Sequence, residues 1–205
     1  SLPLLAAENT MTQLHKAAAA GDTAAIRTLL AEGADIEARD ASGATALLVA
    51  THANKVEAAR TLIEAGANVN AKDDIQDSPY LYAGARGHLD ILKLTLAHGA
   101  DLASINRYGG TSLIPASERG LVETVDTLIK AGVAVDHVNR LGWTALLEAI
   151  ILGDGGKRHQ EIVGLLIAAG ANVNLADNEG VTPLRHARDR GFDEIAALLE
   201  KAGAK

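Results

Sequence analysis

The chain has 205 residues, of which 48% are hydrophobic and 22% charged, a composition typical of a folded soluble protein and not of a disordered one. Its 26 acidic and 19 basic residues give a net charge of -7, which argues against a nucleic-acid partner and against attraction to anionic lipid. The absence of cysteine excludes disulfides and thiolate chemistry, and no apolar run reaches the roughly 18 to 20 residues of a membrane-spanning helix, so we expect no membrane insertion.

A motif that begins with threonine or serine recurs along the chain and predicts the first helix of each copy of a repeat. The copies have the sequences TQLHKAA, TALLVAT, SPYLYAG, TSLIPAS, TALLEAI and TPLRHAR, and successive starts are 33 residues apart four times and then 38 apart. The hydroxyl group at each start can accept a hydrogen bond from the free amides of a helix N-terminus. The starts are Thr12, Thr45, Ser78, Thr111, Thr144 and Thr182.

A second helix follows in each copy, with paired aliphatic residues a few positions before a glycine, as in IRTLLAEGADI and IVGLLIAAGANV. A glycine at this place suits the left-handed conformation that ends a helix. The predicted terminating residues are Gly33, Gly66, Gly99, Gly132 and Gly170. The ten or so residues that come next are rich in Asp, Asn and Gly and predict a tight, hairpin-like finger. Since only 2% of the residues are aromatic, we expect a core of small and aliphatic side chains.

These motifs resemble the ankyrin-repeat family over essentially the whole chain, because its G-x-T-P-L-H-x-A type start and its G-A-D-V-N type end recur in register. The details also resemble those of small bacterial ankyrin proteins, some of which are exported. The resemblance implies an all-α solenoid of six helix-turn-helix repeats with projecting hairpin-like fingers, whose first helices and fingers line a concave face. We expect a single domain over 1–205, with repeats at about 8–39, 40–72, 73–105, 106–138, 139–176 and 177–205. Asn54 departs from the pattern, since it stands where repeats usually carry glycine.

The two ends of the array are predicted to differ from its middle, because an outer repeat has one uncovered face. Glu200 replaces an aliphatic residue of the other second helices and predicts a C-terminal cap that faces solvent. Leu2, Leu4 and Leu5 are predicted to fold back over the first repeat. Because Ser1 could follow the removal of a tag or an export signal, both the bacterial cytoplasm and the periplasm stay open as locations.

The stretch ILGDGGKRHQEIV in the fifth repeat has the composition of a phosphate loop but not its pattern. No Ser or Thr follows Lys157, and the glycine spacing differs from that of a P-loop. From Ala149 to Ile162 the chain advances 13 positions, against 8 for the equivalent step in the last repeat, which indicates a five-residue insertion between two helices. Asp154 and His159 could contact a cation there, but we interpret them as solvated loop residues.

Catalytic and metal-binding patterns are not found. The seven histidines are scattered without an H-x-x-x-H pair, and His15 occupies a motif position where a structural hydrogen bond is expected. No G-x-S-x-G nucleophile motif is present. We therefore expect no enzyme, no cofactor, no metal site and no catalytic residues.

Surface positions of the fingers predict where a partner binds. Exposed aromatic residues and arginines are enriched at binding hot spots, so we expect a centre of Arg107, Tyr108, Arg140 and Trp143, with Ile75 and Leu141 beside it. Alternatively, Tyr108 and Trp143 pack against neighbouring fingers. The first helices are predicted to extend the surface through Tyr82, Arg86, Arg119 and Glu148, and Pro115 is expected to distort its helix or to open the groove.

The expected function is that of a non-enzymatic, monomeric scaffold that binds a protein or peptide partner on its concave face and finger tips. An alternative is a small-ligand or metal-responsive protein that uses the Gly-rich insertion at 153–159. A third is an engineered or purely structural array, against which the insertion and Pro115 argue, because an idealised repeat would omit them.

Overall fold

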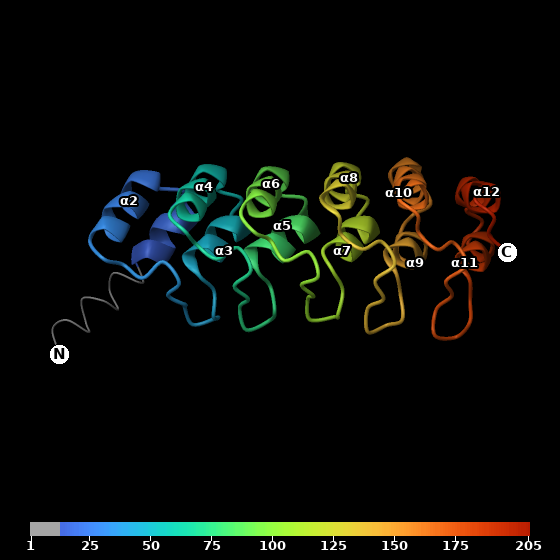
Figure 1. Ribbon diagram of the computed structural model, residues 1–205, viewed down its shortest axis with the longest axis horizontal. Helices are drawn as coiled ribbons and strands as arrows, with labels where there is room; N and C mark the ends of the chain where they lie inside the picture. Colours follow the sequence, from blue (N-terminus) through green and yellow to red (C-terminus); the bar gives the residue numbers. More distant parts are fainter. Residues whose placement is uncertain (1–12) are drawn as a thin grey trace. The chain divides into compact units, whose positions relative to one another are not determined.

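The computed structural model describes residues 13–205, and all regular secondary structure in that range is helical (Figure 1). The predicted all-α class is therefore confirmed. The predicted fold-back of Leu2, Leu4 and Leu5, and the predicted helix start at Thr12, lie outside the described residues. A helix over 13–20 comes first. It is followed by α2 (Thr23–Ala31), α3 (Ala46–His52), α4 (Val56–Glu64), α5 (Pro79–Arg86), α6 (Leu89–Ala97), α7 (Leu113–Glu118), α8 (Val122–Ala131), α9 (Ala145–Ile151), α10 (Lys157–Ala168), α11 (Pro183–Asp189) and α12 (Asp193–Lys201).

The helices belong to two compact units. The first extends to Ala83 and includes His88–Asp101, and the second comprises Gly84–Gly87 and Leu102–Lys205. In the first unit α3 packs on α4, and α4 lies between α2 and α6. In the second unit α9 lies between α7 and α11, α10 lies between α8 and α12, and each helix of the first row packs on one of the second row. Within each unit the fingers project from the row of first helices (Figure 1). The single domain, the repeat boundaries and the count of six stay predictions.

Helix starts are capped as the motif predicts in four copies. The hydroxyl oxygens of Thr45, Thr144 and Thr182 accept a hydrogen bond from the backbone N–H three residues later, at 3.2 to 3.3 Å. Ser78 does the same at 3.0 Å. Each such cap satisfies an amide that has no partner inside the helix, and typically contributes about 1 kcal/mol.

The start of α7 is the exception. In a regular copy the backbone N–H of the residue four positions after the cap donates to the carbonyl of the capping residue, as Glu148 does to Thr144 at 2.9 Å. Pro115 has no N–H, and the amide of Ile114 donates instead to the carbonyl of Thr111 at 3.2 Å. Oγ1 of Thr111 is left buried without a hydrogen-bond partner among the described residues. The predicted cap at Thr111 is therefore wrong, whereas the distortion predicted for Pro115 is confirmed.

Left-handed backbone positions follow the repeat. The five predicted terminating glycines all have positive φ, between 85° and 99°. Two non-glycine residues among those described share this conformation, Asn54 at 51° and Gln76 at 68°. Both stand where other copies carry glycine, such as Gly191 (69°) for the former and Gly180 (79°) for the latter. A side chain in this region clashes with its own backbone, so these two positions are strained.

The core is built from aliphatic and small side chains, as the composition predicts. Tyr80 is fully buried among them and takes the place of the motif leucine. Fully buried aliphatic residues include Leu14, Ile26, Leu47, Leu62, Ile91, Leu92, Leu113, Leu128 and Leu147. Glu200 is exposed and accepts a hydrogen bond from Arg188 at 2.8 Å, which confirms that it faces solvent. Among residues 13–205, none of the helices combines the length and the apolar character that crossing a membrane requires.

Candidate partner-binding surface

Each finger is held in shape by an asparagine or aspartate at its base. Oδ1 of Asn139 accepts hydrogen bonds from the backbone N–H groups of Leu141 (3.0 Å) and Trp143 (3.1 Å). Oδ1 of Asn106 accepts in the same way from Tyr108 at 2.9 Å. The side chain at the tip is therefore not needed to keep the turn in shape.

The sequence pattern contained these base residues, but sequence reasoning did not single them out. An Asp or Asn stands five positions before every motif Thr or Ser from the second copy onward. The base residues are Asp40, Asp73, Asn106, Asn139 and Asp177. Short side chains that accept hydrogen bonds from the backbone two residues on are typical of such turns, and this recurrence was the available signal.

Adjacent fingers are bonded to each other in register. In the second unit the backbone N–H of Arg140 donates to the carbonyl of Tyr108 at 2.9 Å, and Nη1 of Arg140 donates to the carbonyl of Arg107 at 2.7 Å. Nε2 of His137 lies 2.7 Å from the carbonyl oxygen of Gly109. These bonds hold the two fingers side by side, so that equivalent tip residues of the two copies are neighbours.

The tip residues carry large apolar side chains that point into solvent. Tyr108 is 58% exposed and Leu141 is 55% exposed, and both belong to the second unit. Ile75, at the same position of a finger in the first unit, is 54% exposed. The guanidinium of Arg107 lies 5.4 Å from the ring centre of Tyr108, within the range of a cation–π contact. Trp143 is half-buried.

The other predicted residues lie in the first helices or directly after them. Tyr82 is half-buried in the first unit, where its ring meets that of His52 edge to face at a centroid distance of 4.4 Å. Arg86 and Arg119 are exposed in the second unit. Nη1 of Arg119 donates to the carbonyl of Ala85, which anchors one end of its guanidinium.

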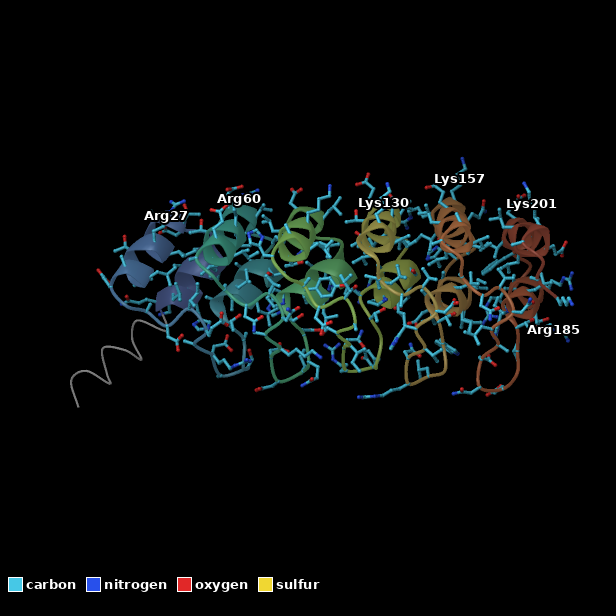
Figure 2. All side chains as sticks on the ribbon, in the orientation of Figure 1. Arg27, Arg60, Lys130, Lys157, Arg185 and Lys201 are labelled. Atoms are coloured by element: carbon cyan, nitrogen blue, oxygen red, sulfur yellow. The ribbon has the colours of Figure 1, made fainter. Side chains whose placement is uncertain are left out.

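Several charged side chains lie on the side of the second helices. Figure 2 shows Arg27 and Arg60 of the first unit, and Lys130, Lys157 and Lys201 of the second, projecting away from the fingers of their own unit. Long charged side chains on such a face are ordinary solvated groups. The apolar residues at the finger tips therefore differ in kind from these charged side chains.

The family model for ankyrin repeats matches this sequence over residues 3–73 and 116–205. The chain belongs to the ankyrin-repeat family. Ankyrin repeats are generally protein–protein interaction modules, and nothing in these matches indicates catalysis. A family match over most of the chain agrees with the resemblance that the recurring motifs predict.

Three solved structures and one bacterial protein illustrate the relationship. An ankyrin repeat domain from Acinetobacter baumannii AYE is 67% identical, with a TM-score of 0.92 over 94% of this chain and 98% of that one. The ankyrin repeat protein EF0377 is 40% identical, with a TM-score of 0.89 over 93% of this chain and 98% of that one. The ankyrin repeat domain of Bcl-3, of the IkappaB family, is 26% identical, with a TM-score of 0.84 over 94% of this chain and 86% of that one. The ankyrin repeat protein YahD of Escherichia coli (strain K12) is 59% identical over 58 residues, which span 28% of this chain and 29% of that protein.

Behind the ankyrin finger of Leu141 lies a buried carboxyl group. Glu148 is only 7% exposed, and its Oε2 accepts a hydrogen bond from Nδ2 of Asn139 at 2.9 Å. Burial raises the pKa of Glu148 to about 7, the charge of Glu118 adds to this rise, and the hydrogen bond from Asn139 opposes it. Glu148 therefore supports the finger from behind, and the structure does not place it on the exposed surface where the sequence predicted it.

The last ankyrin finger is tied to its helix by the equivalent pair. Nε2 of His186 donates to Oδ2 of Asp177 at 2.8 Å, at the positions that Glu148 and Asn139 hold one copy earlier. Burial acts to raise the pKa of Asp177, but hydrogen bonds from the N–H of Val181, from His186 and from the N–H of Glu179 together lower it below its ordinary value. Two fingers of the second unit are thus fastened to their own first helices, while Pro115 stands at this position in the copy before them.

The insertion of the ankyrin array is closely packed. A Cβ added to Gly155 would lie 2.4 Å from a ring carbon of Phe192, and one added to Gly153 would lie 2.0 Å from the carbonyl oxygen of Ala149. These distances are far below van der Waals contact, so the backbone needs glycine at both places. The glycines therefore serve packing as well as turn freedom.

His159 of the insertion is buried and both of its ring nitrogens face protein oxygens. It is 5% exposed, with Nδ1 at 3.0 Å from Oδ1 of Asp154 and Nε2 at 2.7 Å from the carbonyl oxygen of Glu118. The interpretation of His159 as a solvated loop residue is therefore wrong. Hydrogen bonds from the N–H of Gly156 and from His159 lower the pKa of the exposed Asp154.

A group of side chains that the sequence did not bring together lies in the first ankyrin unit. The potential ligand atoms of His52, Asp73 and Asp77 are all within 4.8 Å of one another. Oδ1 of Asp73 accepts hydrogen bonds from the N–H groups of Ile75 (3.1 Å) and Asp77 (2.9 Å), as the base of its finger. A structural role in the turn thus accounts for the buried carboxylate of the group.

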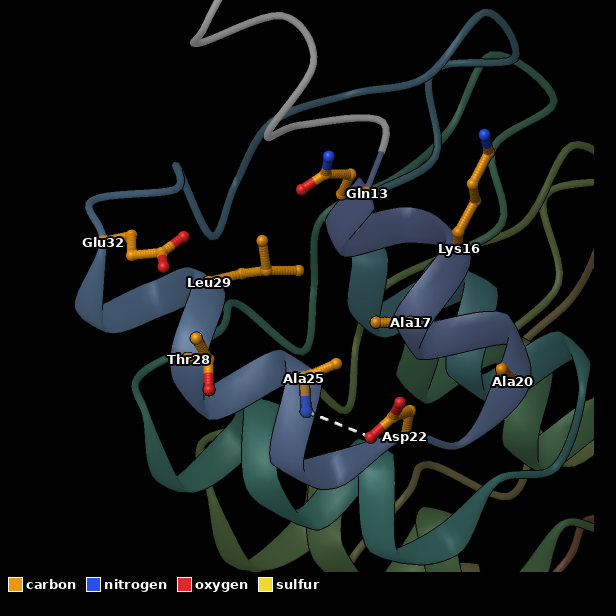
Figure 3. A pocket seen from close by; sticks show the side chains of 9 residues that line it. All are labelled: Gln13, Lys16, Ala17, Ala20, Asp22, Ala25, Thr28, Leu29 and Glu32. Atoms are coloured by element: carbon orange, nitrogen blue, oxygen red, sulfur yellow. Dashed lines mark hydrogen bonds between the residues drawn. The ribbon is translucent and has the colours of Figure 1, made fainter.

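A groove of about 580 Å³ opens between the helix over 13–20 and α2 (Figure 3). Figure 3 shows Lys16, Asp22 and Glu32 at its edges, and Oδ1 of Asp22 accepts a hydrogen bond from the N–H of Ala25 at 3.0 Å. The predicted partner-binding residues do not line this groove.

Proposed function

We propose that this ankyrin protein is a non-enzymatic interaction module that binds a protein or peptide partner on the finger tips of its second unit. The centre of the surface is formed by Arg107, Tyr108, Arg140 and Leu141, with Trp143 beside them. Arg86 and Arg119 of the first helices extend the contact. In the first unit, Ile75 and Tyr82 form a smaller contact of the same kind.

One observation carries the proposal. Tyr108 and Leu141 are more than half exposed, occupy the same position in two bonded neighbouring fingers, and do not hold the fingers in shape. The same position carries Ser42 and Glu179 in other copies, so the fold does not require an apolar residue there. Exposure of neighbouring apolar side chains to water is unfavourable, and such groups are typical of a surface that a partner covers.

The test compares two double variants on a partner captured from the source cell and then purified. Tyr108→Ala with Leu141→Ala is expected to weaken binding by roughly tenfold or more, because each side chain supplies on the order of 1 kcal/mol at a hot spot. Val138→Ala with Leu152→Ala is the matched control, since these residues are 45% and 47% exposed but are not at the tip positions. Equal losses for the two variants, or no loss for the first, would overturn the proposal.

The small-ligand or metal-responsive alternative finds less support. Both nitrogens of His159 face protein oxygens, and Gly153 and Gly155 are packed against neighbouring atoms. We propose instead that the insertion is structural. Calorimetric titration with phosphate, nucleotides and zinc tests this assignment, and saturable heat that His159→Ala abolishes would restore the alternative.

A further inference from the structure

The finger tips of the second unit combine two arginines with two large apolar side chains. Arg107 and Tyr108 are adjacent in one finger, and Arg140 and Leu141 hold the same positions in the next. The chain as a whole is acidic, with a net charge of -7, so the two arginines at the tips contrast with the charge of the whole chain. The equivalent positions elsewhere are Ala41, Asp74 and Asn178, so only these two copies carry a positive charge at this position.

We propose that the partner is an acidic segment of another protein, in which carboxylates alternate with aliphatic or aromatic side chains. A carboxylate pairs with Arg140, the charge of Arg107 adds to the attraction, and the apolar side chains cover Tyr108 and Leu141. This assignment rests on the proposed function, because it takes the finger tips as the binding surface.

Arg140 is placed to receive a carboxylate. It is exposed, and among residues 13–205 none of the ion pairs involves it. One donor of its guanidinium is used by the carbonyl of Arg107 at 2.7 Å, and a guanidinium has five donors in a planar fork. That bond sets the direction of the fork, so less rotational freedom is lost when a carboxylate binds to the remaining edge.

The aromatic ring of Tyr108 orients the second cation. The guanidinium of Arg107 lies 5.4 Å from the centre of that ring, and its positive charge adds to that of Arg140 in the next finger. Asp136, four positions before Arg140, accepts hydrogen bonds from the N–H of Asn172 through both oxygens, at 3.0 and 3.2 Å. The carboxylate of Asp136 is therefore hydrogen-bonded to the next loop and is not paired with Arg140.

The two kinds of contact have different roles. Exposed ion pairs are weak in water, so the arginines select a partner by charge and speed its approach more than they add affinity. The apolar pair supplies the affinity, whereas the ion pairs at the exposed tip are weakened by salt. A partner segment therefore needs both features within a short stretch.

The experiment selects binders to the full chain from a displayed library of random 16-residue peptides. Wild-type selection is expected to enrich Asp and Glu next to apolar residues, and the selected peptides should bind more weakly as salt is raised. Arg107→Glu with Arg140→Glu should weaken these peptides at least tenfold and should itself select basic peptides. Arg107→Lys with Arg140→Lys keeps the charge without the planar fork and should give an intermediate loss. Circular dichroism of each variant shows whether it still folds. The single change Arg140→Glu is measured in the same way, so that a folding defect of the double variant is not mistaken for lost binding.

The outcomes separate this inference from the proposed function. If Tyr108→Ala with Leu141→Ala abolishes peptide binding while the charge reversal does not, the surface is correct and the acidic partner is wrong. If neither variant changes binding, or no binder that depends on the tip is recovered, both proposals fail. Binding to single-stranded DNA or to phosphatidylserine vesicles that depends on the arginines but not on Tyr108 and Leu141 would also overturn the acidic segment.

Discussion

The side-chain amide of Asn139 and the carboxyl group of Glu148 are hydrogen-bonded at 2.9 Å, and both residues are buried behind an exposed finger tip. The bond ties the turn that carries Leu141 to helix α9. It also holds a carboxyl group whose pKa is raised by burial, with Glu118 as a second cause. The finger, its supporting helix and a titrating group are thus coupled.

Replacement of Glu148 by Gln should stabilise the protein at high pH and much less at low pH. The pKa of Glu148 is about 7 in the folded chain against an ordinary value of 4.5, so ionisation favours unfolding. The wild type therefore loses stability as pH rises from about 4.5 to about 7, by up to roughly 3 kcal/mol, and Glu148→Gln removes this loss. Urea unfolding of both proteins at pH 5, 6, 7 and 8 measures the difference. A gap that stays constant with pH would contradict the assignment, and the exposed Glu161→Gln is the control.

Pro115 should determine whether Thr111 contributes to stability. Oγ1 of Thr111 has no partner among the described residues, so Thr111→Val is expected to be nearly neutral, whereas Thr144→Val should cost about 1 kcal/mol through the lost cap. In a Pro115→Ala background the amide at 115 returns and the hydroxyl can cap, so Thr111→Val should then cost about 1 kcal/mol as well. Chemical unfolding of the four proteins gives this double-mutant cycle. Independence of the two sites would refute the explanation.

Gln76→Gly should stabilise the fold by about 1 kcal/mol, because Gln76 is held at φ 68° where the other fingers carry glycine. The reverse change, Gly180→Gln, is a matched control: Gly180 has φ 79° and no atom within 4 Å of an added Cβ. It should lose a similar amount through backbone strain alone. Thermal unfolding measures both variants, and the idea fails if they shift the midpoint in the same direction.

His159→Ala should destabilise the protein by roughly 2 kcal/mol, because it removes the contacts with Asp154 and with the carbonyl of Glu118 from a buried site. His98→Ala removes an exposed contact with the carbonyl of Leu94 and should cost little. Chemical unfolding compares the two. Zinc and phosphate should leave the melting temperature of the wild type unchanged, and a concentration-dependent rise would show that the insertion binds them.

The helices and the family were predictable from the sequence because their determinants are local. A cap such as that of Thr144 acts on the amide three residues later, and a glycine such as Gly132 ends a helix through its own φ. The 33-residue period repeats these local signals along the chain. The class, the family, most helix starts and the site of the insertion follow from these features.

The exposed tips of Tyr108 and Leu141 were also predictable, because a turn closed by its own base residue frees the side chain at the tip. Glu148 and His159 were not. Their burial depends on what the neighbouring copies place around them, as when the ring of His159 meets the carbonyl of Glu118, 41 residues away. Thr111 does not cap its helix because Pro115 has no amide N–H. The link between these two residues is visible only in the hydrogen bonds at the start of the helix.

The sequence by itself therefore determined which segments become helices and fingers, since these depend on residues within a few positions of each other. Tertiary structure decided which polar groups are buried and what each one contacts, because desolvation and hydrogen bonding depend on atoms brought together across copies of the repeat. The difference is clearest at Glu148: its place on a helix was evident from the motif, but its pKa of about 7 results from burial and from the charge of Glu118, which outweigh the hydrogen bond from Asn139.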